Sequence, residues 1–244
     1  ESFRLQARGL VEGGADFLLV ETSQDTLNIK AALEGIDRAG DDLGQRPAVA
    51  VQGTVETMGT LLAGQDVEAL YVSLEHRDLL WMGLNCATGP DFMTDHLRTL
   101  SELSRFPVAC IPNAGLPDED GNYNETPQML ADKLAMFADR GWLNVTGGCC
   151  GTVPEHIELI IKAMAGKAAR QPDAPARNVV SGIEAYEITD EKRPVIVGER
   201  TNVLGSRKFK RLIKEQKFDE AAEVGRAQVR GGAAILDVCL QDPD

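Results

Sequence analysis

Short apolar runs alternate with amphipathic stretches along the first two thirds of the chain. Each run is followed by a polar or glycine-rich segment and then by apolar residues at helical spacing. Continuous apolar runs of this kind are typical of parallel strands that are covered on both faces. The strands are predicted at residues 16–20, 48–51, 80–84, 107–111 and 142–146.

The segments between these strands carry helix-end signals. Residues 3–14 are predicted to be the last part of a first helix, because they end in two glycines. Asp25 is expected to cap the second helix, and Thr126 a later one that has Pro127 at its first position. The remaining helices are predicted near residues 65–76 and 91–104 and from Pro154 onward.

Five strand–helix units with polar loops after the strands indicate an α/β fold of the (β/α) barrel type. A (β/α)8 TIM barrel needs eight strands to close. We therefore expect an N-terminally incomplete TIM barrel, with its site at the C-terminal ends of the strands. The structural alternative is a flavodoxin-like open sheet, which five strands would satisfy.

The character of the chain changes after residue 165. Residues 166–193 are small, charged and punctuated by proline, as linkers are. A new apolar run then begins a second domain, and the predicted organisation is a barrel at 1–165, a linker at 166–193 and a second domain at 194–244. Elements of this second domain are expected at residues 194–198, 206–216, 219–230 and 233–238.

Charge and composition narrow the class of function. Asp and Glu number 38 against 25 Lys and Arg, a net charge of −13, which argues against nucleic acid or an anionic membrane as a partner. No apolar run approaches the length of a membrane span, and the first residues do not resemble a signal peptide. Five unevenly spaced cysteines are not a secreted disulfide framework. The predicted location is cytoplasmic.

Adjacent thiols at one strand end are the strongest chemical signal. Cys149 and Cys150 stand in a glycine-rich turn, where small neighbours let the backbone bend around a thiophilic cation. Cys86, at the end of another apolar run, is the best candidate for a third ligand. Three thiolates would bind zinc and leave its fourth position free, as in catalytic sites. The alternatives are a vicinal disulfide or redox sensor for the pair, and a buried apolar role for Cys86.

Several motifs in combination resemble the family of cobalamin-dependent methionine synthases, over essentially the whole chain. By this resemblance, residues 1–165 form the C-terminal portion of a homocysteine-binding zinc barrel. Residues 194–244 form the start of a second TIM barrel, which binds the pterin of methyltetrahydrofolate. The motifs are Gly-Leu-Asn-Cys at 83–86, Pro-Asn-Ala-Gly-Leu-Pro at 112–117, Gly-Gly-Cys-Cys-Gly-Thr at 147–152 and Gly-Glu-Arg-Thr-Asn at 198–202.

The resemblance also implies a reaction. A homocysteine thiolate, bound to zinc that Cys86, Cys149 and Cys150 hold, would accept a methyl group from methylcobalamin. In this family the cobalamin lies on a further domain of the same protein, absent from this chain, and methyltetrahydrofolate recharges it.

Other site residues follow from the same comparison and from turn chemistry. The family uses a Glu at the position of Glu21 to hold the amino group of homocysteine, as a carboxylate can. Asn85 and Asn113 are candidates for contacting the substrate or for forming the turns in which they lie. Asn202 and Asp237 match positions at which the family binds the pterin. The chain departs from the family at Cys239, where many members carry Asn.

Two other functions remain open at this point. One is a cobalamin-independent homocysteine methyltransferase, which takes its methyl group from betaine or S-methylmethionine and would share the three cysteines. The second domain argues against it, because those enzymes need no second barrel. The other is an inactive, merely zinc-binding fragment.

Overall fold

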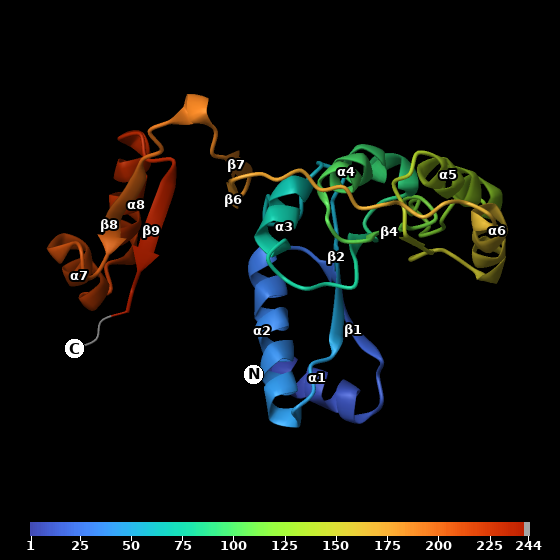
Figure 1. The fold of residues 1–244 in the computed structure, drawn as a ribbon, viewed down its shortest axis with the longest axis horizontal. Coiled ribbons are helices and arrows are strands. Elements are labelled where there is room, and N and C mark those ends of the chain that lie inside the picture. Colours follow the sequence, from blue (N-terminus) through green and yellow to red (C-terminus); the bar gives the residue numbers. More distant parts are fainter. Residues whose placement is uncertain (242–244) are drawn as a thin grey trace. The chain divides into compact units, whose positions relative to one another are not determined.

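The computed structural model describes residues 1–241, which divide into two compact units between Glu187 and Ile188. Each unit has its own cluster of buried apolar side chains. Figure 1 labels most of the elements of the two units along the chain.

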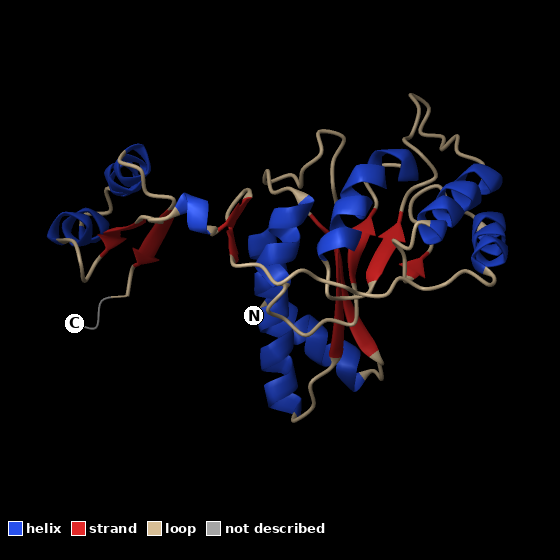
Figure 2. Cartoon of the chain, turned by 45° about the horizontal axis from the view of Figure 1, so that its top comes forward, coloured by secondary structure: helices blue, strands red, loops and turns tan. Residues whose placement is uncertain are grey.

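The first unit contains a five-stranded sheet in which all pairings are parallel. Figure 2 shows its strands side by side with helices around them. Each strand pairs with its neighbours in sequence, whereas a flavodoxin-like sheet places its second strand outside the first. The order therefore fits a partial TIM-barrel-like fold, and the flavodoxin-like alternative is wrong. The strands are β1 (Phe17–Ser23), β2 (Ala48–Gly53), β3 (Met82–Asn85), β4 (Val108–Ile111) and β5 (Val145–Thr146).

Six helices accompany this sheet, and their sequence-predicted caps are confirmed. The Asp25 carboxylate accepts from the Asn28 backbone N–H at 2.6 Å, and the Thr126 hydroxyl accepts from the Met129 N–H at 3.3 Å. The helices are α1 (Ser2–Glu12), α2 (Thr26–Leu43), α3 (Val67–Leu74), α4 (Pro90–Leu103), α5 (Pro127–Asp139) and α6 (Pro154–Met164).

The main core lies between the sheet and these helices. Alternate residues of the central strands, such as Met82 and Leu84 of β3, are fully buried in it. Cys110 of β4, which lies in the apolar run at residues 107–111, belongs to the same cluster. Gly83 points to the opposite face, where a Cβ would lie 2.4 Å from the Ala109 carbonyl oxygen. Only glycine fits there, so β3 and β4 can approach closely.

The last strand is shorter than the sequence predicts, because a side chain replaces part of its ladder. Asn144 donates its backbone N–H to the Val108 carbonyl at 2.8 Å and accepts the Val108 N–H on its side-chain oxygen, also at 2.8 Å. The regular strand is therefore limited to Val145–Thr146, directly before the Cys149–Cys150 turn.

Most of the segment predicted as a linker, residues 166–193, packs on the first unit. It contains the hairpin of β6 (Val179–Ser181) and β7 (Ala185–Glu187), followed by the short helix η1 (Asp190–Lys192). The Ser181 hydroxyl donates to the Ala69 carbonyl of α3 at 2.9 Å. The small, charged and proline-punctuated composition predicts a linker here, but it could not reveal these long-range contacts.

The second unit is a smaller α/β arrangement. Strands β8 (Val197–Asn202) and β9 (Ile235–Cys239) are parallel. Val203 and the buried side chains of α7 (Arg207–Lys214) and α8 (Phe218–Arg230) form the apolar cluster. β8 begins later than predicted and includes the Gly-Glu-Arg-Thr-Asn motif. Pro194 has no N–H to give to a ladder, and bonding between the two strands begins at the Ile196 carbonyl, which accepts from the Ala234 N–H at 3.0 Å.

Across residues 1–241, no helix has both the length and the apolar character needed to span a bilayer.

Candidate metal centre

The structure brings the three predicted cysteines together at the C-terminal edge of the first sheet. Cys86 follows β3, and Cys149 and Cys150 follow β5. The Sγ atom of Cys150 lies 3.7 Å from that of Cys86 and 3.9 Å from that of Cys149. The three sulfur atoms all lie within 4.8 Å of one another. Such a cluster can hold a metal ion.

These separations fit zinc. A tetrahedral zinc ion with bonds of about 2.3 Å to sulfur places its thiolates about 3.8 Å apart. The observed separations of 3.7 and 3.9 Å are on either side of that value. All five cysteines are free thiols, so the vicinal disulfide, with sulfurs about 2.05 Å apart, is not formed. Cys150 is exposed, which leaves the cluster open to solvent on one side.

Cys86 is held by an unusual backbone. Cys86 and Ala87 both adopt positive φ angles, 61° and 57°, which turn the chain sharply after β3. The Cys86 N–H donates to the Ile111 carbonyl at 3.1 Å, and its carbonyl accepts from the Thr88 N–H at 2.7 Å. These bonds hold the strained turn and aim the thiol at the other two.

The Cys149–Cys150 turn is fixed by the loop after β4. The Cys149 N–H donates to the Pro112 carbonyl at 2.8 Å, and the Cys150 carbonyl accepts from the Ala114 N–H at 2.9 Å. The Cys150 N–H donates to the side-chain oxygen of Asn113 at 3.0 Å. Asn113 is only 3% exposed, and its side-chain oxygen supports the backbone that carries the Cys150 thiol.

The electrostatics of the cluster favour a cation. Burial, together with the neighbouring thiols of Cys86 and Cys150, raises the pKa of Cys149 to about 12. Thiolates in contact repel one another, so without a metal the Cys149 thiol keeps its proton at neutral pH. A dication would displace that proton on binding. Burial alone raises the pKa of Cys110 to about 12, which agrees with its place in the core.

Tyr123 is a neighbour of this site that sequence reasoning missed. It lies in the polar loop after β4 and is paired with Pro117 by an isolated antiparallel bridge. Its ring rests on Gly151, so closely that a Cβ on Gly151 would lie 2.2 Å from the Tyr123 Cγ. Burial and the Cys150 thiol raise the pKa of Tyr123. No spacing rule could place this tyrosine, because the loop folds back over the next turn.

Replacing Gly151 with alanine should weaken zinc binding about tenfold or more, since left-handed alanine costs about 1–2 kcal/mol. Gly151 has a φ of 77°, and the added methyl group would also displace Tyr123 beside Cys150. Competition with a chromophoric chelator measures the effect. Gly141→Ala is the matched control: Gly141 has a φ of 73°, but a Cβ there meets no atom within 4 Å. Equal losses in both variants would contradict a local effect.

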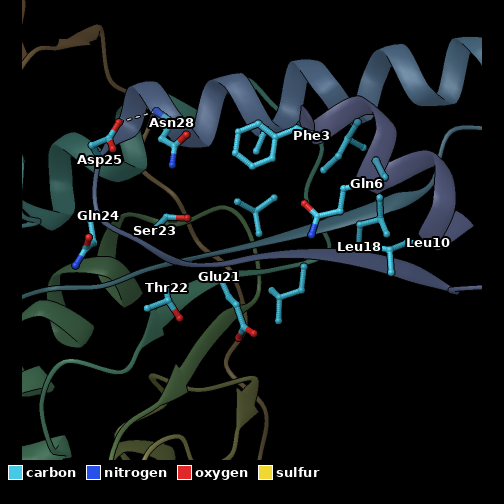
Figure 3. A pocket seen from close by; sticks show the side chains of 15 residues that line it. Phe3, Gln6, Leu10, Leu18, Glu21, Thr22, Ser23, Gln24, Asp25 and Asn28 are labelled. Atoms are coloured by element: carbon cyan, nitrogen blue, oxygen red, sulfur yellow. Dashed lines mark hydrogen bonds between the residues drawn. The ribbon is translucent and has the colours of Figure 1, made fainter. Parts of the chain in front are cut away.

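Glu21 lies at the same edge of the sheet, on β1. Its side chain is exposed, and within residues 1–241 it has no hydrogen-bond or ion-pair partner. It borders a cavity of about 430 Å³ between α1, β1 and the start of α2. Figure 3 shows Glu21 on the side of β1 that faces away from Phe3. A carboxylate in this position is free to bind a cationic group.

The pair predicted to recognise a pterin meets in the second unit. Asn202 of β8 donates its side-chain N–H to the Asp237 carboxylate of β9 at 3.0 Å. The Asn202 side-chain oxygen accepts from the Leu204 N–H at 2.8 Å, so it organises the turn after β8. Cys239 ends β9 close by in sequence. The juxtaposition agrees with a shared site, and the pterin itself stays a prediction.

Comparison with known proteins gives the family and the fold. The pattern of the family described as homocysteine S-methyltransferase matches residues 1–164. The homocysteine methyltransferase MmuM of Escherichia coli is similar in structure: its apo form has 22% sequence identity and a TM-score of 0.50, over 66% of this chain and 56% of that chain. Its oxidized form has 22% identity and a TM-score of 0.51, over 66% and 51% of the two chains.

The metallated form of MmuM gives a TM-score of 0.50 at 22% identity, over 65% of this chain and 50% of that chain. At this identity the likeness shows the fold. The chain spans about half the length of these relatives.

Proposed function

The chain belongs to the homocysteine S-methyltransferase family, and from this premise we propose that Cys86, Cys149 and Cys150 hold zinc and that homocysteine binds there through its thiol. The observation that carries the proposal is the cluster of three thiols, 3.7 and 3.9 Å apart, at the C-terminal edge of the sheet. The position that three protein ligands leave free on zinc suits a substrate thiol.

Residues of the chain would also activate the substrate thiol and bind its ammonium group. Bound zinc would favour the thiolate of homocysteine at neutral pH, while three cysteine thiolates keep that sulfur electron-rich and nucleophilic. The exposed carboxylate of Glu21 would bind the substrate ammonium group. The thiolate sulfur then forms the new bond to the methyl carbon, and the donor keeps the electron pair of the bond that breaks.

For the methyl source we propose the methionine synthase type: methylcobalamin on another domain, recharged by methyltetrahydrofolate. Residues 194–244 would be the start of the pterin-binding barrel. Support comes from the Gly-Glu-Arg-Thr-Asn motif on β8 and from the contact between Asn202 and Asp237. A methyltransferase that takes its methyl group from betaine or S-methylmethionine would not need this second unit. Incubating the zinc-loaded chain with homocysteine and each donor in turn, and measuring the methylated product, separates the two types of methyltransferase.

X-ray absorption at the zinc edge tests the centre. We expect one zinc per chain with three sulfur neighbours at about 2.3 Å, and four when homocysteine is added. Homoserine, with a hydroxyl in place of the thiol, is the matched ligand control and should leave three. A chain without zinc, whose Cys149 and Cys150 are joined in a disulfide, would contradict the proposal.

A further inference from the structure

The side chain of Asn85 connects β3 to β1 across the intervening strand β2. Its Nδ2 atom donates to the Thr22 hydroxyl oxygen at 2.8 Å, and its Oδ1 atom accepts from the Thr22 backbone N–H at 2.9 Å. Asn85 is only 1% exposed, so water competes little for these bonds. We call this pair of bonds the Asn85–Thr22 clasp.

A third bond ties the clasp to β2. The Thr54 hydroxyl, just beyond β2, donates to the Asn85 backbone carbonyl at 3.1 Å, and the Thr54 N–H donates to the Ser23 carbonyl at 2.9 Å. The ends of three strands are thereby joined through polar groups that leave little freedom at this edge.

The residues of the clasp and their neighbours include unfavourable backbone conformations, which indicates that the clasp helps to hold them. Thr22 has a φ of 54°, which a β-branched residue rarely adopts, and Cys86 has a φ of 61°. The pairing of β1 with β2 is irregular between Val20 and Ser23. Such conformations persist only where surrounding contacts hold them. The clasp supplies two of those contacts to Thr22.

The residues next to the clasp are the two ends of the proposed substrate site. Glu21 immediately precedes Thr22, and Cys86 immediately follows Asn85. Figure 3 shows Glu21 and Thr22 on the same side of β1. The bonds between Thr22 and Asn85 therefore link the backbone that carries Glu21 to the backbone that carries Cys86.

We propose that Asn85 is a positioning residue whose clasp with Thr22 sets the separation of these two ends of the site and so selects the chain length of the amino thiol substrate. The inference rests on the proposed function, in which Glu21 binds the ammonium group and the metal binds the thiol. A ligand held at both ends must span a fixed distance. Cysteine is one methylene group shorter than homocysteine, so it loses full contact at one end.

The test compares the binding of homocysteine and cysteine to the zinc-loaded full chain by titration calorimetry. The wild-type chain should favour homocysteine by roughly 10–200-fold, the range that one methylene group gives in other enzymes. Asn85→Ala should keep one zinc per chain, weaken homocysteine binding about tenfold and bring the preference over cysteine close to one. Asn178→Ala, which replaces an exposed asparagine far along the chain, should change neither.

A second variant separates the clasp from general damage. Thr22→Val keeps the shape and branching of the side chain but removes the hydroxyl that accepts from Asn85. It should weaken homocysteine binding less than Asn85→Ala does, because the backbone N–H bond remains. In the double variant the effect should equal that of Asn85→Ala alone, since the two substitutions break the same bond.

The outcomes are distinguishable. A wild-type chain that binds zinc but no homocysteine would overturn the proposed function and this inference together. Wild-type binding with an unchanged preference for homocysteine in both Asn85→Ala and Thr22→Val would overturn this inference alone. So would the loss of zinc from both variants, because the clasp would then serve the metal ligands rather than the distance to Glu21.

Discussion

Replacing Cys149 with serine is expected to abolish stoichiometric zinc binding and, with it, methyl transfer to homocysteine. The half-buried thiol of Cys149 lies 3.9 Å from Cys150, and its loss leaves two sulfurs where a catalytic zinc site uses three protein ligands. Serine is nearly isosteric, but its hydroxyl is a poor ligand that keeps its proton. The loss of affinity should exceed the roughly 10–100-fold that removing a partner of a metal ligand costs.

Zinc per chain, measured by mass spectrometry after dialysis, checks this prediction, and chelator competition gives the affinity. Cys239→Ser is the matched control, because Cys239 is also a half-buried free thiol but belongs to the second unit. It should keep one zinc per chain. Stoichiometric zinc in Cys149→Ser would show that the three thiols do not form the site.

The metal centre was predictable from the sequence because of a topological rule. Parallel strands in sequential order bring their C-terminal ends to one edge, so thiols that follow two strands can meet although 63 residues separate Cys86 from Cys149. The strand and helix pattern of the first unit followed from apolar runs and from capping residues. These signals are local, and a single sequence displays them directly.

What the sequence could not show depends on contacts between distant residues. Asn85 and Asn113 were predicted to contact the substrate or to form turns. The structure adds that the Asn85 side-chain oxygen accepts from the Thr22 N–H of β1, and that of Asn113 from the Cys150 N–H. The hairpin of β6 and β7 lies in a segment with the composition of a linker. In the same segment, Arg170 donates to backbone carbonyls more than 60 residues away in the chain.

Arg170 itself should be among the most important residues for the stability of the first unit. It is 4% exposed, and its guanidinium donates to the backbone carbonyls of Ser101 at 2.8 Å, of Phe106 at 3.0 Å and of Ser104. Burial lowers the pKa of Arg170, but arginine remains charged at neutral pH. The planar guanidinium thus donates to backbone carbonyls at the end of α4 and just after it. The last carbonyls of a helix have no hydrogen-bond partner within the helix.

Arg170→Met is therefore expected to lower the free energy of unfolding of the first unit by about 2–5 kcal/mol, because it fills similar space but removes the guanidinium donor from the buried carbonyls of Ser101 and Ser104. Urea unfolding followed by tryptophan fluorescence measures this, since both tryptophans, Trp81 and Trp142, lie in the first unit. Arg98→Met is the matched control: Arg98 forms an exposed ion pair on α4, and its loss should change stability by at most about 0.5 kcal/mol. Equal effects of the two substitutions would mean that the buried Arg170 guanidinium does not hold the segment after α6 to the first unit.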